Sequence, residues 1–421
     1  MTRQRLRENC AAAFRRLRFT GAIALVVGIQ LIFGAVSLWA QDSTNTTPEL
    51  NIYGFAMLDT GYETGQSDPN WFDTMRPSKL QSFPDQYGKD GRWFAGVRQS
   101  RFGVKADIPT STNGLHLKTI FEFELFGTGV DAGQTTFRLR HAYGELGKFG
   151  AGQTWSLFMD PDVFPNSIEY WGPNGMVFFR NVQARFIPWS KGGSSLMVAI
   201  ERPGASADQG IYADRIELGG VTGRFPAPDV TGQFRMAGKK GHIQVAGIYR
   251  RMNYDDLNAT PTFDLTGHAN GWGINVSSNI KLAKHVVRLQ YVHGEGIENY
   301  MNDAPADIGV QSNPGNTKTP IVGKALPITG IVSFVDLNFS DKWSSTVGYS
   351  FAGITNSDGQ GGTAMKNGHY GLGNVMYYPV KGAMMGPEIQ WGQREGKNGF
   401  TETDYKFQFS AKYNFNFKVG G

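Results

Sequence analysis

Cysteine is almost absent from this chain, whose 421 residues include a single one, Cys10. It precedes a long apolar run, in a stretch that we expect to be removed, so the mature chain would contain no cysteine. Disulfide bridges and cysteine–zinc sites are thereby excluded. The 7 histidines show no ligand-like spacing. We therefore predict no metal site and no cofactor.

Acidic residues are scarce at the N-terminus, where residues 1–18 hold six arginines and one acid, Glu8. An apolar run follows over residues 21–40, and then a polar stretch. A basic head, an apolar middle and a small residue at the exit are typical of a secretory signal peptide. We predict that residues 1–40 are a cleaved signal and that residues 41–421 form one domain. The alternative is an uncleaved anchor, because about 20 apolar residues suffice to span a bilayer.

Excess charge is missing from the predicted mature chain. The whole sequence has 41 basic and 36 acidic residues, and 35 of each remain beyond residue 40. The net charge of +5 therefore reflects the export signal. It does not indicate a nucleic-acid partner.

Beyond residue 40 no apolar run is long enough for a membrane-spanning helix. Aromatic residues nevertheless make up 13% of the chain, and 55 residues are glycine. This combination suits strands that place a lipid-facing residue at every second position, which a hydropathy average conceals. No linker divides the chain. One large barrel explains that continuity better than several soluble domains.

The alternation is clearest over residues 405–417, which read YKFQFSAKYNFNF. Side chains alternate across a strand, so one face is aromatic-rich and the other polar. In an outer-membrane barrel the aromatic face contacts lipid. We expect Phe415 and Phe417 to act as the assembly signal for the barrel-assembly machinery. The usual terminal phenylalanine is absent, because KVGG follows Phe417.

Similar segments recur along the chain, joined alternately by short turns and by long polar loops. The largest loops lie near residues 64–92, 202–228 and 296–325. Short turns at one rim and long loops at the other are typical of bacterial outer-membrane barrels, and no blade repeat supports a propeller. The sequence therefore predicts an all-β, transmembrane antiparallel β-barrel of about 16 strands. The sixteen candidate strands are 50–62, 95–107, 115–126, 135–146, 149–158, 176–188, 194–201, 229–237, 242–252, 269–281, 285–295, 326–339, 343–354, 368–379, 383–393 and 403–417.

The period of two also predicts which charged residues face the lumen. A charged side chain facing lipid at mid-depth would cost about 2–4 kcal/mol. Basic residues that alternate with apolar ones are therefore assigned to the inner face. These are Arg101, Lys118, Arg138, Arg140 and Arg185.

A distinctive insertion, residues 158–180, follows the fifth candidate strand. It is the third loop on the long side, and we expect it to fold into the barrel and narrow it. It carries Asp160, Asp162 and Glu169. Acids facing a wall of arginines would create a transverse field that orients charged solutes.

Several of these segments resemble the DcaP-like porins of Gram-negative outer membranes. The resemblance rests on IYGFAMLDTGY, RQSRFGVKADIPT, FRLRHAYGELGKFGAGQTWSLFMDPD and SIEYWGPNG, and is strong over about residues 50–190. It implies a sixteen-stranded homotrimer in the outer membrane, among lipid and lipopolysaccharide, that passes small anions, with dicarboxylates as the proposed class. The family's arginine-rich constriction maps onto Arg101, Arg138, Arg140 and Arg185. The family's N-terminal coiled coil is not expected here.

Three alternatives remain open at this point. The lumen arginines could serve only to balance neighbouring carboxylates such as Glu122 and Glu124. An outer-membrane hydrolase would need a nucleophile and a base, for which His141 and Ser156 are the candidates. Strand parity places His141 outward and Ser156 inward, and no G-x-S-x-G motif replaces them, so an enzyme is not expected. A channel for hydrophobic compounds would need an apolar N-terminal plug, for which the short stretch before the first strand leaves no room.

Overall fold

The chain is described by a computed structural model that covers residues 47–110, 114–213 and 215–420. The signal peptide predicted for residues 1–40 lies outside the described residues. Residues 45–109 and 116–421 form one compact unit, the barrel. The second unit comprises residues 1–44 and 110–115, and among its described residues the Thr110 N–H donates to the Leu115 carbonyl.

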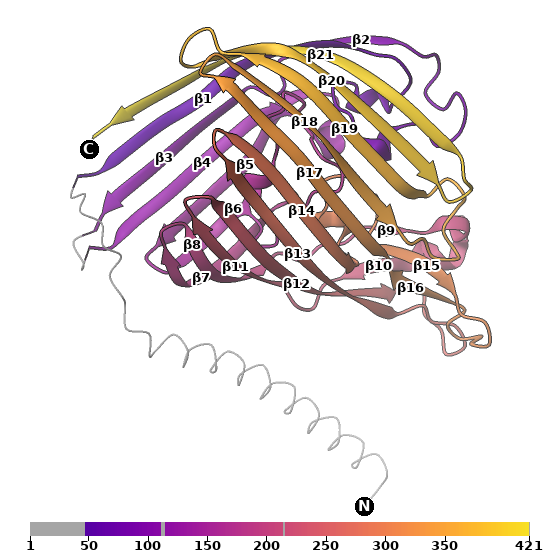
Figure 1. Ribbon diagram of the computed structural model, residues 1–421. Helices are drawn as coiled ribbons and strands as arrows, with labels where there is room; N and C mark the ends of the chain where they lie inside the picture. The colour runs from indigo at the N-terminus through magenta and orange to yellow at the C-terminus, as the bar shows by residue number, and fades with distance from the viewer. Residues whose placement is uncertain (1–46, 111–113, 214, 421) are drawn as a thin grey trace, which may run out of the picture. The chain divides into compact units, whose positions relative to one another are not determined.

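The barrel wall has sixteen antiparallel strand positions (Figure 1). Two of these positions are each filled by two shorter consecutive strands, one by β2 and β3 and the other by β10 and β11. The last strand pairs with the first, from Leu50 with Val419 to Glu63 with Lys406, and this pairing closes the wall. The predicted count of sixteen is confirmed. The strands are β1 (Glu49–Glu63), β2 (Arg92–Gly96), β3 (Arg101–Pro109), β4 (His116–Phe126), β5 (Thr135–Leu146), β6 (Phe149–Trp155), β7 (Arg180–Lys191), β8 (Ser194–Glu201), β10 (Val221–Arg224), β11 (Asp229–Gly238), β12 (Gly241–Asp256), β13 (Gly267–Leu282), β14 (His285–Glu295), β17 (Pro327–Ser340), β18 (Trp343–Ile354), β19 (Met365–Tyr377), β20 (Ala383–Gly396) and β21 (Thr401–Val419).

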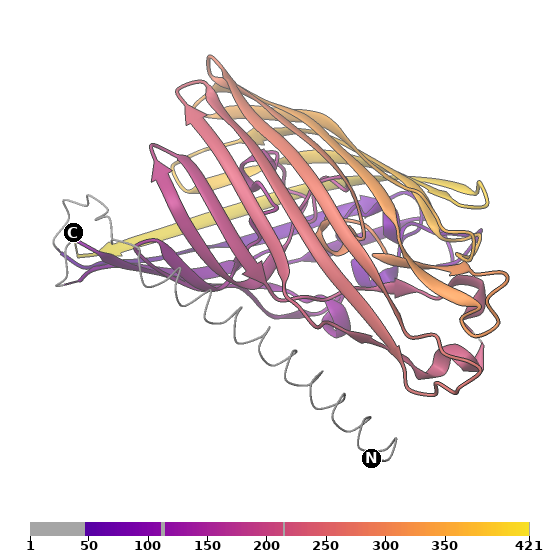
Figure 2. The same ribbon diagram turned by 90° about the horizontal axis from the view of Figure 1, so that it is seen from below.

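The two rims of the barrel differ. Short turns join β5 to β6, β7 to β8 and β11 to β12 at one rim, and long segments lie at the other (Figure 2). The long-loop rim carries a small second sheet of β9 (Ala207–Asp208), β15 (Ile308–Ser312) and β16 (Ile321–Ala325). The described residues contain short 3₁₀ helices but no α-helix, and none of these helices is long and apolar enough to cross a membrane. The 3₁₀ helices are η1 (Pro69–Trp71), η2 (Pro77–Lys79), η3 (Gly129–Asp131), η4 (Pro161–Val163), η5 (Gly210–Tyr212), η6 (Ile216–Gly220) and η7 (Glu298–Tyr300).

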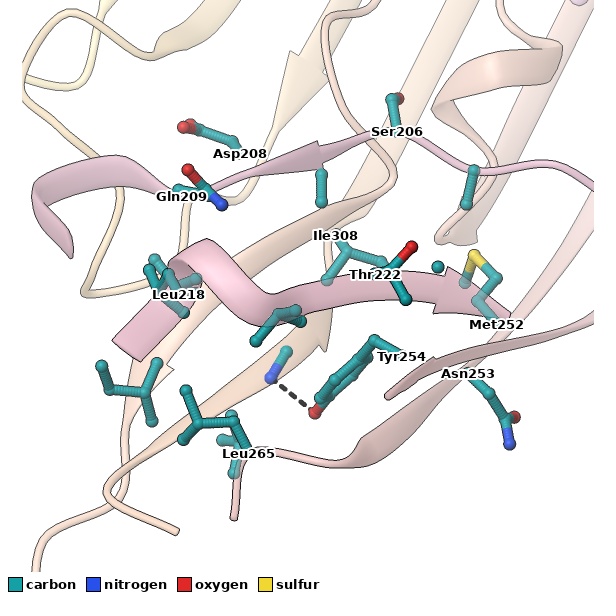
Figure 3. Close-up of a pocket in the computed structure, with 18 of the residues that line it drawn as sticks. Ser206, Asp208, Gln209, Leu218, Thr222, Met252, Asn253, Tyr254, Leu265 and Ile308 are labelled. Atoms are coloured by element: carbon teal, nitrogen blue, oxygen red, sulfur yellow. Dashed lines mark hydrogen bonds between the residues drawn. The ribbon is translucent and has the colours of Figure 1, made fainter. Parts of the chain in front are cut away.

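A mainly apolar cavity of about 180 Å³ lies beneath this small sheet (Figure 3). Leu218, Leu265 and Ile308 line it, and the Tyr254 hydroxyl accepts a hydrogen bond from the Gly323 N–H at 2.8 Å. Its lining comes mainly from segments of the long-loop rim, within residues 205–225 and 308–323. It therefore belongs to the packing of the rim.

The wall shows the predicted alternation between an apolar outer face and a polar inner face. On β12, Ile243, Val245 and Tyr249 are exposed, whereas Gln244 and Arg250 are buried. Such an apolar outer face suits contact with the hydrocarbon of a bilayer.

One part of the predicted parity is wrong. A β-bulge interrupts the pairing of β4 with β5, where Glu122 is opposite His141 but the next residue, Phe123, is opposite Leu139. Arg140 is the extra residue, and the bulge reverses the alternation beyond it. His141 is therefore buried on the inner side, where its Nδ1 lies 2.9 Å from the Thr154 hydroxyl. It does not face outward as the sequence suggested.

Candidate functional site

Two glutamates on β4 form the centre of a charged cluster inside the barrel. Glu124 is fully buried, and its carboxylate accepts hydrogen bonds from Arg140 Nη1 at 2.6 Å and Arg101 Nη2 at 3.1 Å. Glu122 accepts from Arg140 Nε at 2.6 Å and from the Tyr53 hydroxyl at 2.7 Å. The pairing of β3, β4 and β5 brings these residues together, because Glu124 is opposite Arg101 on one side and Arg138 on the other.

Two further guanidinium groups surround the same carboxylate. Arg138 Nη1 and Arg180 Nη2 lie 3.7 Å and 3.9 Å from Glu124 Oε1. We call Arg101, Arg138, Arg140 and Arg180 the arginine cluster. Its four guanidinium groups share two carboxylates, so positive charge is in excess. Arg140 and Arg180 are nearly buried, whereas the side chains of Arg101 and Arg138 are 25% and 28% exposed.

A cavity of about 320 Å³ lies beside the arginine cluster. Arg138 and Arg180 line it together with Arg76, which comes from the long segment after β1. The Arg76 guanidinium packs against the rings of Trp71 and Trp171, 4.1 Å and 4.0 Å from their centroids. Its Nε donates to Asp303 at 2.9 Å. Aromatic faces and an ion pair thus hold this cation in place.

The predicted loop, residues 158–180, contacts side chains on the polar inner face of the opposite wall. The Ile168 N–H donates to Glu388 on β20 at 3.1 Å, and the Ile168 carbonyl accepts from Gln408 on β21 at 3.2 Å. The Gly175 N–H donates to the Ser350 hydroxyl on β18 at 2.9 Å. The Tyr170 hydroxyl donates back to Glu124 in the arginine cluster. The segment is thus hydrogen-bonded to side chains of β4, β18, β20 and β21.

The acids of this loop make their contacts away from the arginine cluster. Asp160 and Asp162 both bind Arg235 on β11, and Asp160 also accepts from the Ser277 hydroxyl at 2.7 Å. Glu169 is buried and accepts the N–H groups of its own loop, among them that of Trp171 at 3.0 Å. Burial raises the pKa of Glu169 to about 8. The acids in contact with the arginine cluster are instead Glu122 and Glu124 on the wall.

Asp160, Asp162 and His242 place ligand atoms within 4.8 Å of one another. The Arg235 guanidinium binds both carboxylates, and the His242 ring lies 2.6 Å from Asp160. These contacts already neutralise the charge that would attract a cation. The grouping is therefore explained by ion pairing.

Two predicted lumen residues lie outside the arginine cluster. Arg185 Nη2 donates to the Trp155 carbonyl at 2.7 Å, and its guanidinium lies 5.1 Å from the centre of the Tyr143 ring. Lys118 is exposed and lines another cavity of about 390 Å³, together with Lys105 and Glu145. The alternation of side chains therefore assigned both residues to the inner face but did not indicate their height along the barrel axis.

Sequence reasoning missed Arg180 of the arginine cluster and Arg76, which lines the adjacent cavity. Arg180 begins β7 directly after two phenylalanines, so it has no preceding alternation from which to read its face. Arg76 lies in a long loop without any period. Trp71 and Trp171 are the residues against which the Arg76 guanidinium packs. They are far apart in the sequence, so the sequence alone does not indicate that their rings meet.

The two residues considered for a hydrolase have different partners. The Ser156 hydroxyl donates to Glu201 at 2.8 Å, and the His141 ring hydrogen-bonds to the Thr154 hydroxyl. A nucleophile and its base would bond to each other.

A closed sixteen-stranded barrel with an apolar outer face and a charged lumen defines an outer-membrane channel of the porin class. The model of the DcaP outer membrane protein family matches residues 89–307, which is more than half of the chain. The chain belongs to this family, as its sequence segments indicated, and is located in the Gram-negative outer membrane.

Solved structures show the same fold. The outer membrane channel DcaP of Acinetobacter baumannii is 19% identical, with 90% of this chain and 100% of that chain covered and a TM-score of 0.72. An anion-selective porin from Comamonas acidovorans is 9% identical, covering 87% and 100%, with a TM-score of 0.53. A trimer form of in-vitro folded OmpT, an outer membrane protein of Vibrio cholerae, is 13% identical, covering 87% and 99%, with a TM-score of 0.51. No curated protein matches the chain.

Proposed function

We propose that this channel passes small solutes by passive diffusion and prefers anions, carboxylates in particular. The observation that carries the proposal is the arginine cluster, in which four guanidinium groups share two carboxylates beside an open cavity. Guanidinium groups stay charged at any working pH and bind carboxylates in a planar, bidentate manner. Fixed positive charge in a narrow passage raises the local concentration of anions.

The inner loop strengthens this preference by narrowing the passage. The Ile168 N–H donates to Glu388, the Ile168 carbonyl accepts from Gln408 and the Tyr170 hydroxyl donates to Glu124, and these contacts support an inward fold of residues 158–180. A solute would therefore pass close to the exposed members Arg101 and Arg138. At short range and away from bulk salt, each charge acts more strongly than it would in open solution.

Dicarboxylates are the class we favour among anions. Arg76, Arg138 and Arg180 line one cavity, so separate guanidinium groups are available for two carboxylates. The alternative role, in which an arginine only balances neighbouring carboxylates, applies mainly to Arg140, whose guanidinium lies 2.6 Å from both Glu122 and Glu124. Arg138 donates to the Tyr170 hydroxyl at 3.1 Å and lies 3.7 Å from its carboxylate, and its partly exposed guanidinium lines the cavity, where a solute can reach it.

We further propose a homotrimer that is inserted by the barrel-assembly machinery and contacts lipopolysaccharide, with no catalytic activity. A trimer form among the structural neighbours supports the oligomer. The separate partners of His141 and Ser156 support a channel rather than a hydrolase.

Liposome swelling tests the solute preference. Purified protein in neutral-lipid vesicles is exposed to isotonic succinate, to a neutral polyol of similar size and to a diamine. We expect the swelling rate to fall in that order. Equal rates for all three would show an unselective pore, and faster entry of the diamine would overturn the proposal.

A further inference from the structure

The outer face of the barrel carries an apolar groove of about 610 Å³, separate from the lumen site. Its lining consists of Ala151, Gly152, Val182, Gln183, Ala184, Ile200, Glu201, Arg202, Pro203, Phe225, Pro226, Ala227 and Pro228. Gln183 and Glu201 turn their side chains inward, so they contribute backbone. The groove lies on β6, β7 and β8 and is bordered by residues 225–228, between β10 and β11.

Small residues set the floor of this groove. Ala151 is paired with Ala184, and Ala184 with Ile200, so two adjacent strands present only methyl groups outward at this level. Gly152, the register partner of Gln183, lines the groove through its backbone. Elsewhere the outer face carries bulky exposed residues such as Phe121 and Phe137.

The side of the groove is suited to contact with lipid. Residues 225–228 read Phe-Pro-Ala-Pro and separate β10 from β11, which share one strand position of the wall. Irregular backbone is costly against hydrocarbon because of its unpaired N–H groups. Proline has no N–H, so Pro226 and Pro228 remove two of the donors that would otherwise need a partner.

A cation lies at the long-loop end of the groove. Arg202 follows β8 directly, and its backbone N–H donates to the Val182 carbonyl at 2.8 Å. Its side chain is exposed, and no acidic side chain among the described residues forms an ion pair with it. From Ser194 at the short-turn rim, the eight residues of β8 climb roughly 20 Å, given about 3.3 Å per residue and a tilt of about 40°. Arg202 therefore lies near the outer edge of an apolar band about 25 Å tall.

We propose that this groove binds one phosphorylated lipid of the outer leaflet, with an acyl chain over Ala151 and Ala184 and a phosphate on Arg202. Hydrocarbon fits the apolar floor, and guanidinium matches phosphate in charge and geometry. A second copy of the chain would cover the floor equally well but would leave Arg202 without an anion. The charge at the rim therefore favours the lipid. The proposal is independent of solute selectivity.

Native mass spectrometry of the full chain, delipidated in mild detergent, tests the proposal. The probes are diphosphoryl lipid A and its dephosphorylated form. We expect one diphosphoryl lipid retained per chain and at least fivefold weaker retention of the dephosphorylated form. Arg202→Gln should abolish this discrimination. Ala184→Phe and, independently, Ala151→Leu should fill the groove and remove both lipids.

Val245→Phe, at an exposed outer position on β12, is the matched control and should leave retention unchanged. Folding of each variant is checked by the shift in gel mobility on boiling. Wild-type retention in both filled variants would overturn the proposal. Loss of oligomer with unchanged lipid retention would overturn it in favour of a subunit contact at this face.

Discussion

Arg140 carries two of the shortest charge contacts in the arginine cluster, at 2.6 Å to Glu122 and 2.6 Å to Glu124. Arg140→Gln would leave these buried carboxylates short of a partner, which typically costs about 3–5 kcal/mol. Arg138→Gln is the matched control, because a partly exposed contact at 3.7 Å contributes about 1 kcal/mol or less. Urea unfolding in detergent, followed by gel mobility, should show a clear loss for the first variant only. Equal midpoints would mean that Arg140 has no structural role.

Glu169 gives the loop a dependence on pH. Burial raises its pKa to about 8 from an ordinary value of 4.5. The folded protein therefore holds this proton more tightly than the unfolded chain does. Its contribution to stability is complete below about pH 4.5 and is lost as the pH rises through 8.

Glu169→Gln is neutral throughout this range, so the variant should lack that part of the pH dependence. We expect the difference in Tm between variant and wild type to move in favour of the variant from pH 5 to pH 9, by a few degrees. Tryptophan fluorescence on heating measures both proteins. A constant difference across the range would show that Glu169 does not titrate in the folded loop.

At the scale of single residues, the sequence predicted three of the four members of the arginine cluster. Alternation assigned Arg101, Arg138 and Arg140 to the lumen, and on β5 it holds only up to the bulge at Arg140. Asp160 and Glu169 were placed opposite the arginines, but their partners are Arg235 and loop backbone. Such pairings join residues far apart in the sequence, and no local period records them.

At the scale of elements, the strands were predicted closely because one face of each is apolar over its full length. Residues 135–146, 194–201, 285–295 and 343–354 are strands with the predicted limits. The break at residues 97–100 was not predicted. There Arg98 turns to bind Asp73 at 2.6 Å, and Gln99 donates to the Ile168 carbonyl at 2.7 Å. Contacts with distant loops cause the interruption.

The final strand provides a test of assembly. Phe415 and Phe417 are opposite Gly54 and Ile52 on β1, at the seam that closes the barrel. Replacing both phenylalanines by serine removes two outward aromatic rings and the proposed recognition signal. We expect at least a tenfold loss of the heat-modifiable form from outer-membrane fractions. Asn414→Ser with Asn416→Ser, on the other face of the strand, is the control. Normal levels of the phenylalanine variant would place the signal elsewhere.

At the scale of the whole molecule, β1 and β21 pair with each other, so the first and last strands of the wall are not free edges. We expect the proposed trimer to migrate as one high-mass species in mild detergent and to collapse to a single chain on boiling. Light scattering of the unheated protein gives the mass independently. A monodisperse monomer in several mild detergents would contradict the trimer and leave the barrel intact.

The most direct measurement of the central claim is the reversal potential of single channels in planar bilayers across a salt gradient. At about 0.01 M salt the Debye length is about 30 Å, so fixed charges act across the whole lumen. The wild-type protein should show a reversal potential whose sign indicates preferential permeation of anions. Arg138→Gln should move it toward zero, and Arg251→Gln, whose guanidinium binds Asn253 and Asn270, should not. A wild-type potential of zero, or of the sign for cations, would contradict the account.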